Sequence, residues 1–354
     1  MENGVDFLLR VECMTYNQAP YIKDALDGFC MQQTTFPFLC IIADDASTDG
    51  EPEVIKKYLD TNFDKIENAL STEDETDEYL RIYARHKKNL NCYFCVVLFK
   101  YNHYSIRKLK VYNIAELVPK IKYMAMCEGD DYWTDPQKLQ KQVDFLEEHE
   151  EYVLSFHDAR TIDAEGNTIA ESKMKLYYSE KMCRDWSDFD LMCGYTPFTP
   201  TVIYRIEVRA KVGREMYKAK GLINGDTIVA SLIGKYGKGK FHADIANSVC
   251  RVQRGGIWQM KTDLYKALNS YRMFTFLASV HKKNKKVRDY IFNYRVKLLR
   301  NIVRLNIEER NTTGFLHYYF KILVMLFVKF KMRDICEVSK DTVHWFRGRK
   351  RGVN

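Results

Sequence analysis

The sequence predicts an α/β fold in which a mostly parallel central sheet is flanked by helices and followed by a basic helical extension. Apolar runs typical of buried strands alternate with amphipathic helix patterns through the first half of the chain, and two of these runs end in paired carboxylates. Residues 261–354 carry 22 Lys+Arg and 7 Asp+Glu, a net charge of +15, whereas the preceding 260 residues carry 33 and 40, a net charge of −7. We therefore expect one domain over residues 1–260 and a separate helical region over 261–354.

Strand and helix patterns alternate in the first part of the chain. Buried strands are predicted by "FLLRVECMTYN" and "FPFLCIIADD", and a helix follows the first in "APYIKDALDGFCMQQ". The stretch "ASTDGEPEVIKKYLDTNF" predicts a second helix, with Ser47, Thr48 or Asp49 as possible caps. The stretch "STEDETDEYLRIYARHKKN" is acidic first and basic later, which predicts a solvated helix. Two more strands are predicted by "CYFCVVLFK" and "KYMAMCEGDD", and Pro136 stands at the first helical position of "TDPQKLQKQVDFLEEH".

The later part of the chain mixes strands and helices. The stretch "YVLSFHDARTIDAEGNTI" predicts a strand, a turn and a returning strand, and "TPTVIYR" predicts another strand. A helix is predicted by "DTIVASLIGKYG" and a strand pair by "KFHADIANSVCRVQ". From Lys261 onward the pattern is helical.

Composition narrows the class of protein. Among ten cysteines, Cys92 and Cys95 form a lone C-x-x-C without a second ligand pair, so buried reduced thiols explain them better than zinc does. The N-terminus "MENGVDFLLRVEC" starts acidic, and its apolar run is too short for a signal peptide. No window reaches the roughly 20 apolar residues of a membrane-spanning helix. We therefore expect a cytoplasmic protein.

Carboxylates close two of the predicted strands. Asp44 and Asp45 end one strand, and Glu128, Asp130 and Asp131 follow another. Because ligands of open parallel sheets bind beyond the carboxyl ends of the strands, both groups are expected in one crevice. Helix capping and solvation remain the alternative for either group alone. Together they favour Mg²⁺ or Mn²⁺ with a diphosphate, and the missing glycine-rich phosphate-loop motifs argue against the usual nucleotide folds.

Two long phrases, "TYNQAPYIKDALDGFCMQQTTFPFLCIIADDASTDG" and "CEGDDYWTDPQKLQKQVDFLE", closely resemble the family 2 glycosyltransferases, inverting enzymes of the A-type nucleotide-sugar fold. The similarity spans residues 7–260 and is greatest to bacterial members that build cell-surface polysaccharides. The resemblance implies transfer from a nucleoside-diphosphate sugar, with a UDP-sugar favoured, to a hydroxyl of a glycan or lipid-linked acceptor. It also implies Mg²⁺ or Mn²⁺ as the cofactor.

The resemblance implies nucleotide-binding roles for the ends of the first two strands. Thr15, Tyr16 and Asn17 would border the base, with the Tyr16 ring available for stacking. Asp45 would accept a hydrogen bond from the base, and Asp44 would support it.

The second acidic group stands where the family has its D-x-D-type motif. One aspartate of this motif binds the ribose side of the nucleotide and one ligates the metal that bridges the diphosphate. Asp130 is a candidate for both roles, and Asp131 is the favoured metal ligand. Glu128 takes the place of the motif's first aspartate in many relatives, and Trp133 is expected to shape the pocket beside it.

The resemblance places the catalytic base at a helix start in the second half of the chain. The phrase "NGDTIVASLIGKYG" matches that place, which makes Asp226 the candidate base. A helix N-cap is the alternative role for this aspartate.

The phrase "CRVQRGGIW" matches a further family motif in part. Arg251 and the run of Gly255, Gly256 and Trp258 agree with it, whereas Gln253 replaces the usual histidine. Because glutamine is a poor metal ligand, we expect Arg251 to neutralise phosphate charge and the glycines to let the loop cross the donor site closely.

The basic region contains "FLHYYFKILVMLFVKFKMR", in which lysines flank a seven-residue apolar centre. The alternatives are an interfacial helix on the inner face of the cytoplasmic membrane and a core helix with lysines at its rim. No motif supports nucleic acid as a partner.

Two other functions compete with sugar transfer. One is a catalytically impaired nucleotide-sugar-binding protein, for which Gln253 would be the sign, although Asp45, Asp131 and Asp226 are intact. The other is a different phosphosugar-transferring enzyme, against which the missing glycine-rich nucleotide loops argue.

Overall fold

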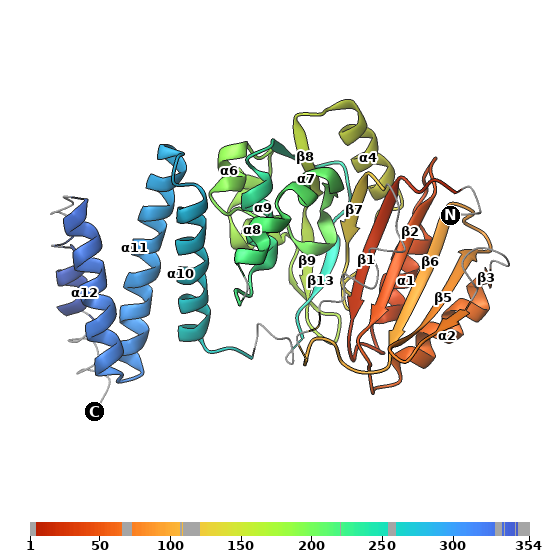
Figure 1. The fold of residues 1–354 in the computed structure, drawn as a ribbon, viewed down its shortest axis with the longest axis horizontal. Helices are drawn as coiled ribbons and strands as arrows, with labels where there is room; N and C mark the ends of the chain where they lie inside the picture. Colours follow the sequence, from red (N-terminus) through yellow and green to blue (C-terminus); the bar gives the residue numbers. More distant parts are fainter. Residues whose placement is uncertain are drawn as a thin grey trace. The chain divides into compact units, whose positions relative to one another are not determined.

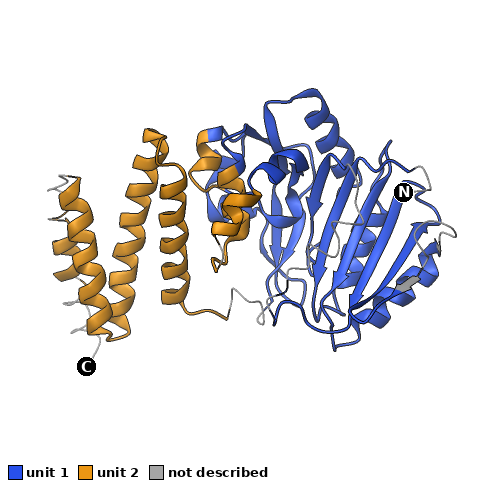
Figure 2. Ribbon diagram, viewed as in Figure 1, with its two compact units in different colours: residues 1–188, 196–212, 233–253 blue, residues 189–195, 213–232, 254–354 orange. Residues whose placement is uncertain are grey.

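The computed structural model describes residues 5–65, 73–106, 108, 121–219, 221–253 and 260–329, and near the C-terminus residues 335, 337–343 and 345. The chain divides into two units (Figure 2). Unit 1 comprises residues 1–188, 196–212 and 233–253, and unit 2 comprises residues 189–195, 213–232 and 254–354.

A ten-stranded mixed sheet forms the centre of unit 1 in the described part of the chain. Its middle strands follow the order β7-β1-β2-β6 and pair in parallel (Figure 1). The bounds of these strands are β1 Leu9–Thr15, β2 Phe38–Asp44, β6 Cys92–Phe99 and β7 Tyr123–Met126. Because both faces of β2 and β6 are buried along their whole length, these strands are continuous apolar runs rather than alternating ones. The predicted parallel centre is confirmed.

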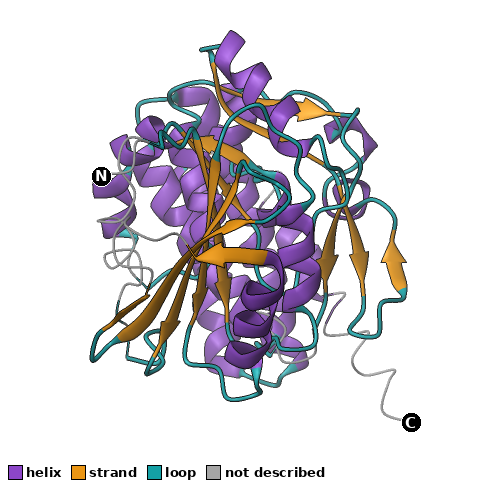
Figure 3. Cartoon of the chain, turned by 90° about the vertical axis from the view of Figure 1, so that its right-hand side faces the viewer, coloured by secondary structure: helices purple, strands orange, loops and turns teal. Residues whose placement is uncertain are grey.

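Antiparallel strands extend the sheet on both sides, and its strands splay with the usual twist (Figure 3). On the β6 side lie β3 (Phe63–Lys65), β4 (Glu73–Glu75) and β5 (Tyr79–His86). On the β7 side, β11 (Ile203–Arg205) separates β7 from β8 (Tyr152–His157), and β12 (Lys238–His242) pairs in parallel with β8.

The solvated helix predicted over residues 71–89 is wrong, because this stretch forms β4 and β5. Its charges mark the exposed positions of an edge region, whereas Ile82 and Ala84, two residues apart, are buried. The period of two, and the pairing of β5 with β6, outweigh the helical charge pattern.

Helices flank the large sheet of unit 1 (Figure 1). The main helices of unit 1 are α1 (Ile22–Cys30), α2 (Glu51–Asn62) and α4 (Lys138–Glu148), with shorter α5 (Lys173–Tyr177) and α7 (Ile206–Lys211). The predicted apolar stripe of α1 is buried. Arg205 closes the C-terminal end of α4, donating to the carbonyls of Leu146 and His149, the latter at 3.0 Å.

A three-stranded sheet lies beside the large one in unit 1. Its order is β10 (Thr168–Ala170), β9 (Ala159–Ile162) and β13 (Ser248–Arg251). The predicted turn around Gly166 joins β9 and β10, and the φ of +92° at Gly166 explains the glycine. The predicted strand pair β12 and β13 forms, but the two strands join different sheets.

Unit 2 is helical in its described residues, as predicted for the basic region. The helices are α8 (Gly213–Lys218), α9 (Gly225–Ile233), α10 (Asp263–Val280), α11 (Lys285–Glu308) and α12 (Thr312–Val328), with α6 (Asp188–Met192) at the unit boundary. Side-chain oxygens of Thr262, Asn284 and Asn311 cap the last three helices. Along the described ranges, none of the helices combines the length and apolar character needed to cross a bilayer.

Candidate active site

The carboxyl ends of β1 and β2 lie side by side, because the parallel register pairs Thr15 with Asp44. The Asp45 backbone N–H extends this pairing by donating to the Thr15 carbonyl at 3.0 Å. The buried Asp44 carboxylate accepts the backbone N–H of Ser47 at 3.1 Å and the Ser47 hydroxyl. Burial still raises the pKa of Asp44 above its ordinary value. Asp44 therefore holds the turn that follows β2.

Asp45 is buried at the same edge of the sheet. Its carboxylate accepts the backbone N–H groups of His103 at 2.8 Å and Tyr104 at 3.1 Å, and the Asn102 side chain donates to its carbonyl at 3.1 Å. The turn after β6 thus fixes the carboxylate that we expect to face a base.

The turn after β1 presents Tyr16 and locks Asn17. The Tyr16 side chain is exposed, as a stacking ring requires. Asn17 adopts a left-handed φ of +54°. Its N–H donates to Ser47 Oγ and its Oδ1 accepts the Thr48 N–H, both at 2.8 Å. These two bonds join the turns after β1 and β2 into one rim.

Glu51 belongs to this rim and was missed by sequence reasoning. It is fully buried and accepts the Gln18 N–H and the Ser47 hydroxyl at 2.9 Å each, together with the Thr15 hydroxyl. Burial raises the pKa of Glu51. The available signal was its position at the start of a helix that follows strand-end acids, where a carboxylate can bind backbone N–H groups.

The acidic loop after β7 reaches the same rim. Carboxylate oxygens of Glu128, Asp130 and Asp131 lie within 4.8 Å of one another, with Asp131 buried and Glu128 exposed. Gly129 lies against the end of β1, where a Cβ atom would overlap the Thr15 hydroxyl and lie 2.5 Å from Gln18 Oε1. Only a residue without a side chain allows this approach. The acids closing β2 and β7 therefore share one edge, as predicted.

Burial raises the pKa values of the two aspartates in the acidic loop. Burial, followed by the charges of Asp130 and Glu128, raises the pKa of Asp131 well above its ordinary value. Burial also raises the pKa of Asp130, even though Gln253 and Arg251 act in the other direction. Three hard oxygen donors that repel one another are a suitable set for Mg²⁺ or Mn²⁺, which would relieve the repulsion.

The end of β13 brings two further predicted residues to the acidic loop. The Arg251 N–H donates to Asp131 Oδ1 at 2.8 Å, and its Nε donates to the Asp130 carbonyl at 3.3 Å. Gln253 Nε2 donates to Asp130 Oδ2 at 2.7 Å. The Arg251 guanidinium also lies 4.4 Å from the centre of the Tyr21 ring. Gln253 thus meets the acids as a hydrogen-bond donor.

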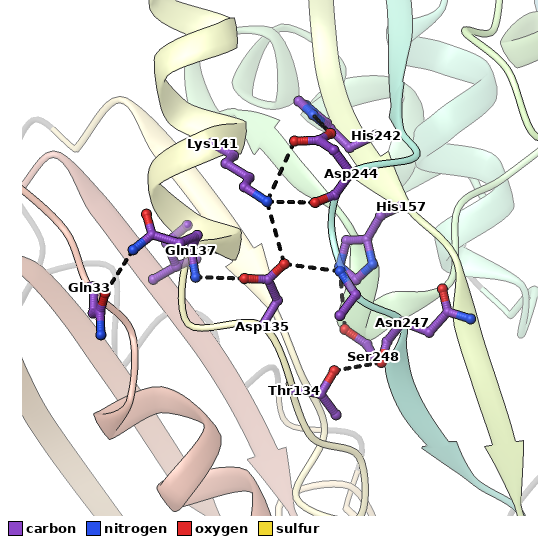
Figure 4. A network of polar contacts seen from close by, with 12 residues as sticks. Gln33, Thr134, Asp135, Gln137, Lys141, His157, His242, Asp244, Asn247 and Ser248 are labelled. Atoms are coloured by element: carbon purple, nitrogen blue, oxygen red, sulfur yellow. Dashed lines mark hydrogen bonds and ion pairs between the residues drawn. The ribbon is translucent and has the colours of Figure 1, made fainter.

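Hydrogen bonds and ion pairs connect the acidic loop and the start of α4 to β13 and to the residues just before it. Tyr132 and Val249 exchange backbone hydrogen bonds of 3.1 and 2.8 Å. Farther along, the Thr134 hydroxyl donates to the Asn247 carbonyl at 2.7 Å (Figure 4). The Lys141 ammonium group lies 3.6 Å from Asp135 and 3.5 Å from Asp244 (Figure 4). These contacts fix where Arg251 and Gln253 meet the carboxylates.

Trp133 lies in the core of unit 1. Its side chain is 2% exposed, packs edge-on against Phe29 at 4.9 Å, and donates from Nε1 to the Pro200 carbonyl at 2.7 Å. The buried Lys138 ammonium lies 4.4 Å from the ring centre, and burial lowers the pKa of Lys138 to about 7. The buried Trp133 side chain therefore anchors the C-terminal end of the acidic loop to the core of unit 1.

The remaining predicted residues are Asp226, Gly255, Gly256 and Trp258. Asp226 belongs to unit 2, in the first turn of α9, where its Oδ1 accepts the Thr227 N–H at 2.7 Å. It lies inside the helix rather than at the N-cap, in a turn where the helix dipole favours a carboxylate. Gly255, Gly256 and Trp258 lie outside the described residues.

Comparison with known proteins shows which sequences and structures this chain resembles. Residues 13–205 match the sequence profile described as Glycosyl transferase family 2. Uncharacterized proteins of Mycobacterium bovis and Mycobacterium tuberculosis are 34% identical over 163 residues, which are 46% of this chain and 38% of theirs. The match thus spans well under half the length of these curated relatives.

Among solved structures, S. aureus TarS 1–349, crystallised with UDP-GlcNAc, superposes with a TM-score of 0.53 at 15% identity. The superposition covers 90% of this chain and 81% of that one. The likeness confirms the A-type nucleotide-sugar fold predicted from the sequence. Because the sequence profile matches more than half of the 354 residues, the chain belongs to glycosyl transferase family 2.

Proposed function

We propose that this protein is a metal-dependent inverting glycosyltransferase that moves a sugar from a nucleoside-diphosphate sugar to a hydroxyl group. The observation that carries the proposal is the cluster of Glu128, Asp130 and Asp131 at the carboxyl edge of a parallel sheet, in a chain of this family. Three carboxylates within 4.8 Å of one another are costly unless a cation joins them. A nucleoside diphosphate would provide the remaining oxygen ligands of that cation.

Each residue of the rim has a proposed role at the donor. Asp130 and Asp131 would hold Mg²⁺ or Mn²⁺, and Glu128 stands beside them as a third oxygen donor. Bound there, the cation would stabilise the negative charge of the departing diphosphate. The exposed Tyr16 ring would stack on the base, Asp45 would accept from it, and a UDP-sugar is the favoured donor.

Arg251 and Gln253 have proposed roles on the phosphate side. Arg251 would orient Asp131 through its N–H, which donates at 2.8 Å, while its guanidinium offsets phosphate charge. Gln253 would hold Asp130 in place through the 2.7 Å hydrogen bond. The segment containing Gly255, Gly256 and Trp258 would complete the donor site.

Asp226 is the proposed catalytic base. It would take the proton of an acceptor hydroxyl while that oxygen attacks the anomeric carbon from the side opposite the leaving diphosphate, which inverts the configuration. The acceptor would be a glycan or lipid-linked sugar in surface polysaccharide synthesis, met in the cytoplasm at the inner face of the membrane. We keep the proposed division into a catalytic domain over residues 1–260 and a basic helical region over 261–354.

The first test is a screen of UDP-, GDP- and CDP-sugars with Mn²⁺, scored by donor hydrolysis and by transfer. We predict that Asp226→Asn retains nucleotide binding and loses transfer by about a hundredfold or more, because the general base is gone. Asp263→Asn is the matched control, since Asp263 is an exposed acid in the first turn of α10. Normal transfer by Asp226→Asn would remove this residue from the mechanism. Nucleotide binding without hydrolysis or transfer by the wild type would favour a binding protein instead.

A further inference from the structure

The last described long helix, α12, presents an apolar face to solvent. Phe320, Val324 and Val328 are 60%, 61% and 68% exposed. Leu316 and Phe327 are exposed as well. Since these residues are three or four positions apart, they line one side of the helix. The opposite side, with Ile322 and Leu326, is buried in the core of unit 2.

The lysines of this helix contact other parts of unit 2. Lys321 lies 4.9 Å from the centre of the Tyr271 ring. Lys329 pairs with Asp289 of α11 at 3.4 Å. Both therefore contribute to packing within unit 2, and the helix itself contains no acidic residue from Thr312 to Val328.

Positive charge lies at one end of the apolar face. The pair between Lys329 and Asp289 fixes the C-terminal end of α12 beside the start of α11. There the turn between α10 and α11 carries Lys282 and Lys283, and the first two residues of α11 are Lys285 and Lys286; all four are exposed. The sequence from residue 329 to the end adds eight Lys+Arg against three Asp+Glu.

We propose that this face of unit 2, defined by Leu316, Phe320, Val324, Phe327 and Val328 with the α10–α11 lysines at its end, binds the surface of an anionic lipid bilayer. The apolar side chains enter the boundary between headgroups and acyl chains, and the lysines meet anionic headgroups. The helix lies in the plane of the interface, because its core-facing side is occupied by α11 (Figure 1).

The exposed lysines favour an anionic bilayer over a second copy of the chain as the partner of this face. Two copies joined through α12 would bring two clusters of exposed lysines onto one assembly, at an electrostatic cost. An anionic surface instead complements the same charges. The inference deepens the proposed function, because a lipid-linked acceptor would be met at this surface.

The test is flotation of the full-length protein with vesicles of phosphatidylcholine, alone or mixed with phosphatidylglycerol, without any sugar donor. We expect binding to the mixed vesicles that weakens as salt rises. The triple variant Phe320→Gln, Val324→Gln, Val328→Gln should lower the bound-to-free ratio by about tenfold or more. The control variant Leu90→Gln, Ile169→Gln changes two exposed apolar residues of unit 1 and should bind as the wild type does.

A second variant tests the charges. Replacing Lys282, Lys283, Lys285 and Lys286 by Gln should remove the preference for phosphatidylglycerol. Equal flotation of the wild type and the triple variant would overturn the proposal. So would a dimer in sedimentation that the triple variant converts to a monomer, without vesicle binding. Donor hydrolysis in solution is measured in parallel, so failure of the membrane proposal is distinguished from failure of the donor site.

Discussion

At the scale of single residues, two carboxylates of this site have different surroundings, and we expect them to have opposite effects on stability. Asp45 places both oxygens on backbone N–H donors, at 2.8 and 3.1 Å. Among the described residues, the Asp131 carboxylate accepts one backbone N–H, that of Arg251, and it faces the charges of Asp130 and Glu128. Its charge is therefore a cost to the metal-free fold that a bound cation would remove.

Replacing Asp131 by Asn should stabilise the metal-free protein by about 1 to 2 kcal/mol near neutral pH. Asn keeps an oxygen for the Arg251 N–H and removes the charge. Because folding raises the pKa of Asp131, the folded state binds more protons than the unfolded state, and the charge penalty grows as the pH rises above the ordinary value of 3.8. The gain should therefore be larger at pH 7.5 than at about pH 5, as measured by urea unfolding in EDTA.

Asp45→Asn is the contrasting variant. Its amide nitrogen would face one of two backbone donors, so we expect a loss of about 1 to 3 kcal/mol. A destabilised Asp131→Asn, or equal effects of the two substitutions, would contradict this account of the cluster.

Lys138 gives a prediction with the opposite pH dependence. Its ammonium is fully buried, with Gln142 Oε1 at 2.7 Å and the Trp133 ring as neighbours. Because folding lowers its pKa from 10.5 to about 7, the unfolded state binds more protons between these values, and stability rises with pH there. From pH 6.5 to pH 9, the loss of folding free energy caused by burying Lys138 should shrink by about 2 kcal/mol.

Lys138→Met should therefore stabilise the protein more at pH 6.5 than at pH 9 in urea unfolding. Lys122→Met is the control, since Lys122 is an exposed lysine paired with Glu147 at 3.0 Å. A gain that is the same at both pH values would show that Lys138 remains charged in the fold.

At the scale of elements, the loop between β7 and α4 depends on a close approach to β1. Gly129→Ala would place a Cβ atom against the Thr15 hydroxyl and Gln18 Oε1. We expect the loop to shift and nucleotide binding with Mn²⁺ to weaken about tenfold or more, as measured by calorimetric titration. Gly213→Ala is the matched control, because a Cβ atom there meets nothing within 4 Å. Unchanged binding by Gly129→Ala would show that this approach does not define the site.

Elements with a clear hydrophobic pattern were predictable from the sequence. Elements whose structure depends on pairing with a neighbouring strand were not. The strands β2, β6 and β7 are continuous apolar runs, as expected in a parallel sheet covered on both faces, and β1 alternates buried with half-buried residues. In contrast, β5 carries charges in a helix-like order, and only its pairing with β6 makes it a strand. The edge shared by both acidic groups followed from strand direction alone.

The partners of the acids were predictable only in part. The resemblance brought Arg251 and Gln253 to the site, but not the way in which each binds. The hydrogen bonds from Arg251 to Asp131 and from Gln253 to Asp130 join residues far apart in the sequence. They form because β13 pairs with the acidic loop at the Tyr132–Val249 bridge, which the sequence does not indicate. Glu51 was missed because its partners come from two separate segments, the end of β1 with the turn after it and the turn after β2.

At the scale of the whole molecule, net charge changes sign along the chain near residue 261, whereas unit 2 also includes residues 189–195 and 213–232. The mildly acidic part before residue 261 contains the carboxylate edge, and the basic part contains α10, α11 and α12. Under the proposed function, a phosphate-bearing donor would need a cation at the carboxylate edge, whereas anionic lipids would need none at the basic region. Removing divalent metal should therefore affect donor binding and leave vesicle binding unchanged.

The central claim is that Glu128, Asp130 and Asp131 form a platform for a metal ion and a nucleoside diphosphate. The most direct measurement is the melting temperature of the wild type and of Asp131→Asn with UDP, GDP and CDP, each with Mn²⁺ or with EDTA. The account predicts that at least one nucleotide raises the wild-type melting temperature by several degrees with Mn²⁺ and much less with EDTA, since ligands that bind only the folded state stabilise it. It predicts no metal-dependent rise for Asp131→Asn. A rise that is equal with EDTA, or that survives in Asp131→Asn, would contradict it.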